Sequence, residues 1–234
     1  AGGGNATEHF REVFWLQKPD TKLPPLPKPC AFMSGCVLDD VIYIAGGIET
    51  PMATSALNTF WSLDLKKPDA GWQELPPCPG GGRILSCMSA AEGRVWLFSG
   101  AALKPGADGK AERLWLKDAW SYSETAGWQK QPDMARVAVA APGPAPVVDG
   151  SILIIGGDDG ANVNFEPKSA HPGFPRDVLA FDVNSKTWSK AGEVPFSLVT
   201  TNAVLWNDEI IIPGGEARPG VRSPQVWRLK KAAD

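Results

Sequence analysis

The sequence has little of what several large classes of protein require. Its 234 residues carry 23 basic and 26 acidic side chains, a formal net charge of −3. No basic block stands out, which argues against nucleic-acid binding. The apolar runs are short and interrupted by glycine or proline, so no stretch predicts a membrane-spanning helix. The two histidines (His9, His171) and two tyrosines are too few for the Tyr and His ligand set of a copper oxidase.

Cysteine is also sparse. Cys30, Cys36, Cys78 and Cys87 form no CxxC pair and lie far from both histidines in the sequence, so we expect no metal site. Four buried thiols are the expected state, and one disulfide is the alternative if the protein is exported. The chain opens Ala1-Gly2-Gly3-Gly4 without a methionine or a signal peptide. We expect this opening to be the tail of a repeat unit whose first strands precede it.

Turn-forming and aromatic residues are abundant. The chain has 25 Gly and 22 Pro beside 10 Trp and 9 Phe, a combination that predicts an all-β fold of short strands. A short apolar run ending in glycine recurs four times, at residues 41–47, 95–100, 152–157 and 210–215. Its last glycines lie 53, 57 and 58 residues apart. A period near 50 residues with several strands per unit is typical of a β-propeller.

Each run is followed by the same features. An aromatic-rich segment comes next, at residues 12–16, 60–64, 118–122, 178–182 and 225–229, and then a tryptophan in a short strand at Trp72, Trp128 and Trp188. The pattern predicts one propeller domain over residues 1–234, with units at about 1–29 (partial), 30–79, 80–133, 134–190 and 191–234 (partial). Apolar residues on both faces suggest that the four runs are the inner strands of their blades.

The order of apolar run, Gly-Gly, aromatic strand and Trp resembles the Kelch repeat over nearly the whole chain. Three stretches, residues 71–83, 188–195 and 214–223, are similar to the bacterial N-acetylneuraminate epimerases (sialic acid mutarotases), in particular to members with cyclically permuted repeats. That resemblance implies a six-bladed Kelch propeller, of which this chain holds four to five blades' worth and is incomplete at the N-terminus. It also implies a periplasmic or secreted protein.

The resemblance implies a function as well. An epimerase of this kind interconverts the anomers of N-acetylneuraminate by opening and reclosing the sugar ring, which needs an acid and a base but no metal or cofactor. The family's active-site glutamate and arginine map onto Glu216 and Arg222. A guanidinium can bind the sugar carboxylate through two hydrogen bonds. The alternative for this pair is a surface ion pair that braces the loop between them.

Further polar residues are candidates for binding the sugar acid. Asp158 and Glu49 follow glycine pairs in sister units, so we expect them near the same mouth as Glu216. Arg83 could reach the sugar or form a salt bridge between blades, and Asn164 could offer its amide to the N-acetyl group. A rival function is a non-catalytic Kelch propeller that binds protein or carbohydrate. A mutarotase should have a polar, carboxylate- and arginine-lined central pocket, and an interaction module a flat exposed patch.

Overall fold

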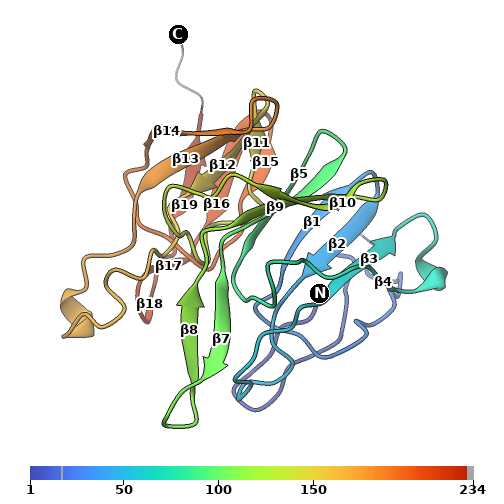
Figure 1. The fold of residues 1–234 in the computed structure, drawn as a ribbon, viewed down its shortest axis with the longest axis horizontal. Coiled ribbons are helices and arrows are strands. Elements are labelled where there is room, and N and C mark those ends of the chain that lie inside the picture. Colours follow the sequence, from blue (N-terminus) through green and yellow to red (C-terminus); the bar gives the residue numbers. More distant parts are fainter. Residues whose placement is uncertain (17, 231–234) are drawn as a thin grey trace.

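The computed structural model describes residues 1–16 and 18–230, and almost all of their regular structure is β (Figure 1). Two single-turn 3-10 helices, η1 (Pro68–Ala70) and η2 (Lys168–Ala170), lie in loops. No described helix has the length and apolar character needed to cross a bilayer. The strands are β1 (Ser34–Leu38), β2 (Val41–Ala45), β3 (Phe60–Asp64), β4 (Gln73–Glu74), β5 (Cys87–Ala91), β6 (Arg94–Phe98), β7 (Ala101–Pro105), β8 (Ala111–Trp115), β9 (Ala119–Ser123), β10 (Gly127–Gln131), β11 (Val147–Val148), β12 (Ser151–Ile155), β13 (Asp177–Asp182), β14 (Thr187–Glu193), β15 (Val204–Trp206), β16 (Glu209–Pro213), β17 (Glu216–Arg218), β18 (Val221–Arg222) and β19 (Val226–Leu229).

These strands form four blades of a β-propeller. The first three blades are four-stranded sheets, β1-β2-β3-β4, β5-β6-β9-β10 and β11-β12-β13-β14, and the fourth is the three-stranded sheet β15-β16-β19. All neighbouring strands within a blade are antiparallel. The four apolar runs become β2, β6, β12 and β16, each in its own sheet. The predicted all-β propeller is therefore confirmed.

The prediction that these runs are the inner strands was wrong. Each run is the second strand of its blade, flanked in the sheet by two others. The strands nearest the axis are β1, β5, β11 and β15, whose residues line the central opening. The error has a physical cause: an apolar run shows that both faces of a strand are covered, but it does not show the position of that strand within the sheet.

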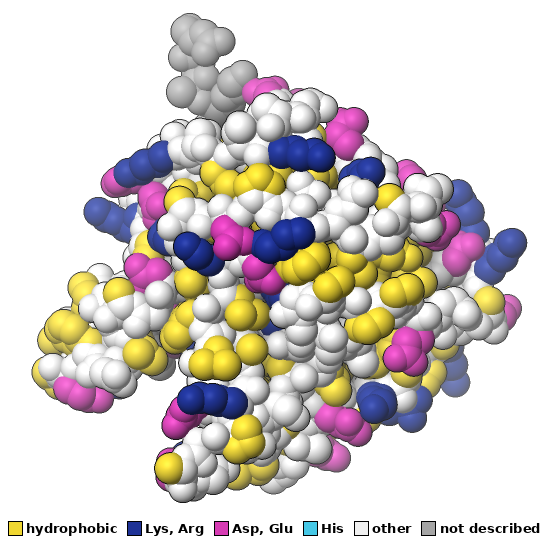
Figure 2. Space-filling view, viewed as in Figure 1, with side chains coloured by type: hydrophobic (Ala, Val, Ile, Leu, Met, Phe, Trp, Pro, Cys, Tyr) yellow, Lys and Arg dark blue, Asp and Glu magenta, His cyan; other side chains and the backbone are white. Residues whose placement is uncertain are grey.

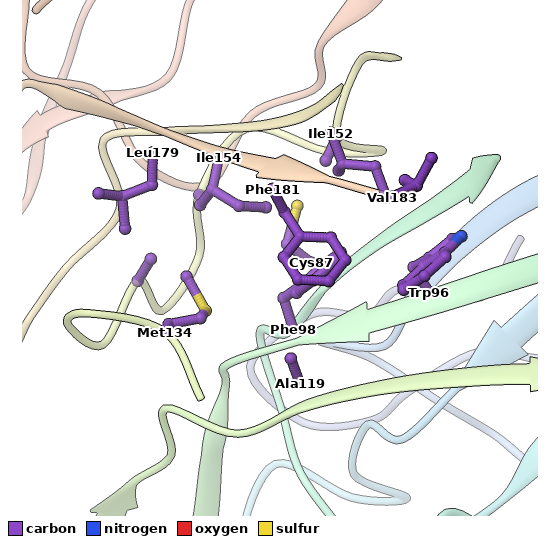
Figure 3. Packing of buried hydrophobic residues seen from close by; sticks show 13 residues of the cluster. Cys87, Trp96, Phe98, Ala119, Met134, Ile152, Ile154, Leu179, Phe181 and Val183 are labelled. Carbon is purple, nitrogen blue, oxygen red and sulfur yellow. The ribbon is translucent and has the colours of Figure 1, made fainter. Parts of the chain in front are cut away.

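Each blade-to-blade interface is a separate hydrophobic cluster. Side chains alternate along the second strand, so Val95 and Leu97 of β6 contact the first blade while Trp96 and Phe98 contact the third. Figure 3 shows Phe98 and Trp96 beside Phe181 and the isoleucines of β12. A third cluster joins β12 and β13 to the fourth blade. Stacking the blades in this way buries the sheet faces that meet between neighbouring blades.

The repeated tryptophans connect successive units at the outer side. Trp72, Trp128 and Trp188 each donate the indole N–H to a proline carbonyl of the preceding unit, at Pro24, Pro76 and Pro132, over 2.8–3.0 Å. Each indole thus packs between blades while its one polar atom is satisfied. This pairing explains why both the Trp and the proline-rich turn recur with the same period.

A chain of backbone hydrogen bonds connects the blades around the axis. Leu85 N–H donates to the Phe32 carbonyl, Ala140 N–H to Leu85 and Thr200 N–H to Ala140, each over 2.8 Å. All four residues have left-handed φ angles between +54° and +59°, a conformation that costs a non-glycine residue about 1–2 kcal/mol. We name this feature the axial ladder, with one rung residue in each blade.

Glycine pairs end the second strands because the chain turns there beside the segment that leads into the first strand of the same blade. Gly157 has a φ of +87°, and a Cβ at that position would lie 2.9 Å from the backbone of Ala138. In the second blade Ser99 stands in place of the first glycine, with a φ of +55°. Its hydroxyl accepts the Ala138 N–H and donates to the Leu116 carbonyl, so two hydrogen bonds offset the strained backbone.

The described part of residues 1–29 makes the same backbone hydrogen bonds that surround the glycine pair of a complete unit, but it does not form a sheet. The Gly3 N–H donates to the Cys30 carbonyl, and the Phe10 N–H donates to the Gly3 carbonyl. The same pattern follows the first blade, where the Gly47 N–H donates to the Arg83 carbonyl and the Leu57 N–H to the Gly47 carbonyl. The aromatic-rich segment at residues 12–16 was expected to be a strand like its counterparts in the other units. This expectation was wrong, because the described residues there form a single isolated bridge, from Phe14 to Lys22. An unpredicted hairpin, β7–β8, follows Gly100. The proposed unit boundaries are not tested and stay predictions.

Both signs of charge are interspersed on the face that Figure 2 shows, with hydrophobic side chains between them across its middle.

The four cysteines are buried and unpaired. Burial raises the pKa of Cys30, Cys36 and Cys87 to about 12, because a thiolate is poorly solvated inside the protein.

Replacing Gly157 tests the requirement for a left-handed glycine at the turn. Gly157→Ala should lower the free energy of unfolding by about 2–5 kcal/mol, from the φ penalty and the clash with Ala138. Gly150→Ala is the matched control, since its φ is +74° but the nearest atom to a Cβ there is 3.9 Å away. It should cost about 1 kcal/mol. Urea unfolding measures both, and equal losses would contradict the close approach at Gly157.

The buried thiols predict slow chemical modification. At pH 8 a thiol with a pKa near 12 has roughly a thousandfold less thiolate than one with its ordinary value. Cys30, Cys36 and Cys87 should therefore react with a disulfide reagent only as the protein unfolds. The release of the coloured thiol, followed with and without denaturant, measures this. Rapid reaction of any of the three in the folded protein would contradict their burial.

Candidate functional site

The axial opening forms a pocket of about 540 Å³ at the end of the blades where the glycine pairs lie. All four blades contribute to it. Its polar groups are hydroxyls and one amide, from Ser34, Ser86, Thr200, Thr201 and Asn202, and Gly215 forms part of its edge. The Ser34 and Ser86 hydroxyls are hydrogen-bonded to each other over 2.7 Å. No charged side chain among the described residues lines the pocket itself. The expectation of a central pocket lined by carboxylates and arginines was therefore wrong for the lining, and the charged candidates lie beside the pocket.

We call the residues that follow the glycine pairs the rim. None of them lines the pocket itself, but each is bridged to the neighbour of a residue that does. Ile48, Ala101, Asp158 and Glu216 occupy equivalent positions in successive blades. Each forms an isolated antiparallel bridge with the segment just before a rung of the axial ladder, at Ala31, Ile84, Val139 and Val199. Apolar members of these bridges pack into one cluster. The two acidic residues therefore stand at neighbouring, equivalent places on the third and fourth blades.

Glu216 and Arg222 face each other across the hairpin β17–β18, which follows Gly215 (Figure 1). The Glu216 carboxylate accepts the Gly220 N–H over 2.9 Å and lies 3.7 Å from the Arg222 guanidinium. Its side chain is 22% exposed, whereas that of Arg222 is 65% exposed. The carboxylate is thus held in place, and the guanidinium retains free N–H groups that face water. The sequence-predicted pair is brought together by this hairpin.

Asp158 is a partly buried rim carboxylate. Partial burial raises the pKa of Asp158. The Gly160 N–H, which donates to its Oδ1 over 2.9 Å, lowers the pKa, and the negative charge of Asp159 raises it further. The charges of Arg113 and His171 lower it by a smaller amount. The net result is a raised pKa, which favours the protonated form more than for an exposed aspartate.

The loop between β12 and β13 is fastened to the hairpin that carries Glu216. Arg218 donates to the Ser169 carbonyl over 2.9 Å. The Ser197 hydroxyl accepts the Phe174 N–H and donates to the Ala217 carbonyl. Within the loop the His171 ring is buried, accepts the Gly173 N–H at Nδ1 and contacts Phe165 and Phe174. These contacts hold one wall of the rim.

Three other candidates lie apart from this rim. Glu49 is exposed and pairs with Lys28 at 3.9 Å. Asn164 is exposed in a turn of the β12–β13 loop. Arg83 is 1% exposed and its two terminal nitrogens bind both oxygens of Asp118 over 2.8 and 2.9 Å, so its fork is already occupied. Arg136 makes the same kind of contact with Asp177 in the third blade.

Sequence reasoning missed the pocket-lining hydroxyls and the Asn202 amide. A signal was present, since each lies within three residues of a rung of the axial ladder, and that spacing recurs with the repeat. The rungs themselves carry no recognisable residue type: they are Phe32, Leu85, Ala140 and Thr200. Without a common residue at the rung, the sequence alone does not mark the axial strands.

Comparisons with known proteins agree with this fold and identify distant relatives. The Kelch motif model matches residues 29–79. The N-acetylneuraminate epimerase of Escherichia coli O9:H4 is 28% identical over 88% of this chain and 60% of its own length. That of Yersinia enterocolitica is 24% identical over 89% of this chain and 57% of its own. A solved structure entitled "Structure of YjhT" superposes with a TM-score of 0.69 at 22% identity, covering 89% of this chain and 65% of the other.

The fold and its repeats define a Kelch β-propeller with an axial pocket. The chain is a Kelch-repeat protein distantly related to N-acetylneuraminate epimerases, at about 25% identity over about 90% of its length. It spans about three fifths of the length of the curated relatives that it matches.

Breaking the Arg83–Asp118 pair tests its structural role. Burial raises the pKa of Asp118, but hydrogen bonds and charge from Arg83 outweigh burial and leave that pKa lowered. Arg83→Met should cost about 3–5 kcal/mol near pH 7, because it leaves a partly buried carboxylate without its partner. Lys190→Met, which breaks an exposed pair with Glu193, is the control and should leave the free energy of unfolding close to that of the wild type.

The same variant should show a defined pH dependence. A carboxyl group with a lowered folded pKa adds stability above its unfolded pKa of about 3.9, and that stability is lost as pH falls through the folded value. The gap in stability between wild type and Arg83→Met should therefore be full above about pH 5 and narrow below pH 4. Urea unfolding across this range measures it. A gap independent of pH would contradict the ion pair.

Proposed function

We propose that this chain carries the active site of a sugar-acid mutarotase that interconverts the anomers of N-acetylneuraminate. The observation that carries the proposal is the placement of Glu216 and Asp158 at equivalent positions of neighbouring blades, on the rim of one polar axial pocket. The names of the distant relatives support it. From the resemblance seen in the sequence, we also propose that the reaction takes place in the periplasm or outside the cell.

Glu216 fits the part of the proton shuttle. Ring opening requires removal of the proton from the anomeric hydroxyl and protonation of the ring oxygen, and ring closure reverses both transfers. The Glu216 carboxylate is accessible, and the Gly220 N–H fixes one of its oxygens. The second oxygen faces Arg222 at 3.7 Å. That is longer than a normal hydrogen bond, so a substrate group can replace this contact on either side chain.

Arg222 fits the part of the carboxylate anchor. Its guanidinium is mostly exposed and contacts Glu216 through one nitrogen only. A planar carboxylate can be bound by the remaining N–H groups in a two-pronged arrangement, which an ammonium group cannot offer. Asp158, with its raised pKa, fits the complementary acid. The neutral groups of the axial pocket then face the hydroxyls of the sugar.

Substitutions at the hairpin test these roles. Glu216→Gln keeps the shape but cannot take a proton, so the rate of anomer interconversion should fall ~10²–10⁴-fold while binding is retained. Arg222→Lys should mainly weaken binding. Proton NMR of freshly released sialic acid measures both. Glu193→Gln, which alters an exposed ion pair on β14, is the control and should leave the rate unchanged.

Two results would contradict the proposal at different levels. A near-normal rate for Glu216→Gln would remove Glu216 from catalysis while leaving the activity. No acceleration of mutarotation by the unmodified protein with any sialic acid would remove the activity, and a non-catalytic carbohydrate- or protein-binding propeller would then be the better account.

A further inference from the structure

The hairpin β7–β8 leaves the rim on the second blade. It begins at Ala101, which occupies the same position after the glycine pair as Asp158 and Glu216. A second hairpin, β17–β18, leaves the rim on the fourth blade (Figure 1). Each hairpin carries an arginine on its second strand, Arg113 on β8 and Arg222 on β18. An arginine-bearing hairpin therefore stands on the blade to either side of Asp158.

One face of the β7–β8 hairpin is turned toward the rim. Side chains alternate between the two faces of a hairpin, and directly paired residues share a face. Leu103 and Trp115 pack against the apolar cluster formed at the rim bridges. Arg113 pairs with Leu103 and lies two residues from Trp115, so it belongs to this same face. Lys104 and Glu112 pair on the opposite face and form an exposed ion pair there, at 3.0 Å.

Strand β8 packs directly on the loop that follows the third glycine pair. A Cβ at Gly160 would lie 2.7 Å from the Trp115 indole, so this close approach requires a glycine. The Gly160 N–H donates to the Asp158 carboxylate. The positive charge of Arg113 lowers the pKa of Asp158, as a guanidinium near that carboxylate should. Packing and charge agree that Arg113 lies beside Asp158.

The Arg113 guanidinium has donors to spare. Its side chain is exposed, and it makes no hydrogen bond and no ion pair with any residue that the structure describes. The two arginines of the other hairpin are engaged, because Arg218 binds the Ser169 carbonyl and Arg222 contacts Glu216. A guanidinium offers five N–H donors in a fixed plane. An exposed arginine is common, but this one is held at the rim by the packing of its own strand.

The order of the charged groups around the axis matches the order of groups along the sugar acid. Arg222 and Glu216 belong to the fourth blade, Asp158 to the third and Arg113 to the second. In N-acetylneuraminate the anomeric carbon carries the carboxylate, and the ring oxygen links it to the carbon that bears a glycerol side chain. With the carboxylate at Arg222, the anomeric hydroxyl at Glu216 and the ring oxygen at Asp158, the glycerol side chain comes next.

We infer that Arg113 is a specificity-determining residue that binds the glycerol side chain of the sugar acid, an inference that rests on the proposed function. The guanidinium donates hydrogen bonds to the side-chain hydroxyls, and the hairpin β7–β8 forms the wall of this subsite. A sugar acid without the side chain binds less tightly, because it offers Arg113 no such acceptors. The hydroxyls take no part in ring opening, so this contact contributes to binding and not to proton transfer.

The test measures whether the residue and the side chain depend on each other. It compares N-acetylneuraminate with an analogue whose glycerol side chain is shortened to a hydroxymethyl group. Amide chemical shifts give the dissociation constants. The wild type should bind the analogue about tenfold more weakly than N-acetylneuraminate. Arg113→Gln should bind N-acetylneuraminate about tenfold more weakly than the wild type does, but should bind the analogue equally well. Its rate of anomer interconversion at saturation should be unchanged.

The matched control is Lys104→Gln. It removes the same charge from the other face of the same hairpin, where Lys104 pairs only with Glu112. Both dissociation constants should stay at their wild-type values. The side chains of Arg113 and Lys104 are both exposed, so both variants should fold, which a cooperative melt would show.

Two results would overturn the inference. Equal losses for the two sugars in Arg113→Gln would mean a general attraction of the anion, and no loss for either would mean no contact. Failure of the proposed function looks different. A wild type that binds N-acetylneuraminate without accelerating anomer interconversion would contradict the proposed activity, while the two sugars would still decide the role of Arg113. A wild type that binds neither sugar would contradict both.

Discussion

The axial ladder is the constraint on which the rest of the structure depends. Phe32, Leu85, Ala140 and Thr200 hold a left-handed conformation that each would avoid in isolation. Three backbone hydrogen bonds between them, together with the apolar clusters between blades, offset that cost. Because each rung joins two blades, the ladder fixes how far each sheet is rotated from the next. The pocket at the axis follows from this arrangement and not from any one blade.

The ladder also determines which residues can form a site. The residue after each glycine pair bridges to the segment before a rung, so Ile48, Ala101, Asp158 and Glu216 are brought to one end of the axis. Two of these positions are apolar and two are acidic, and our proposal assigns the chemistry to the acidic two, on the third and fourth blades. The β17–β18 hairpin and the β12–β13 loop, fastened together by Arg218, then supply the basic and aromatic groups of the rim.

Much of this could be predicted from the sequence, and the gaps have physical reasons. The apolar runs marked β2, β6, β12 and β16, because burial of both sheet faces demands apolar residues. The repeated tryptophans marked the outer strands, because the hydrogen bond from indole to a proline carbonyl requires that residue type. The axial strands were missed because a backbone ladder makes no such demand. Glu216 was found through the family resemblance, and Asp158 by its place after a glycine pair. Arg83 was a candidate for binding the substrate, and only the structure shows that both of its terminal nitrogens are bound to the Asp118 carboxylate.

The central claim is that the ladder gathers Asp158, Glu216 and the neutral pocket lining into one site for a sugar acid. Titration of ¹⁵N-labelled protein with N-acetylneuraminate, followed by amide chemical shifts, tests it most directly. The account predicts saturable shifts at residues 158–160, 200–202 and 215–222, from two blades that are linked at the axis. Shifts confined to the outer strands, or no shift at concentrations that saturate a weak sugar site, would contradict it.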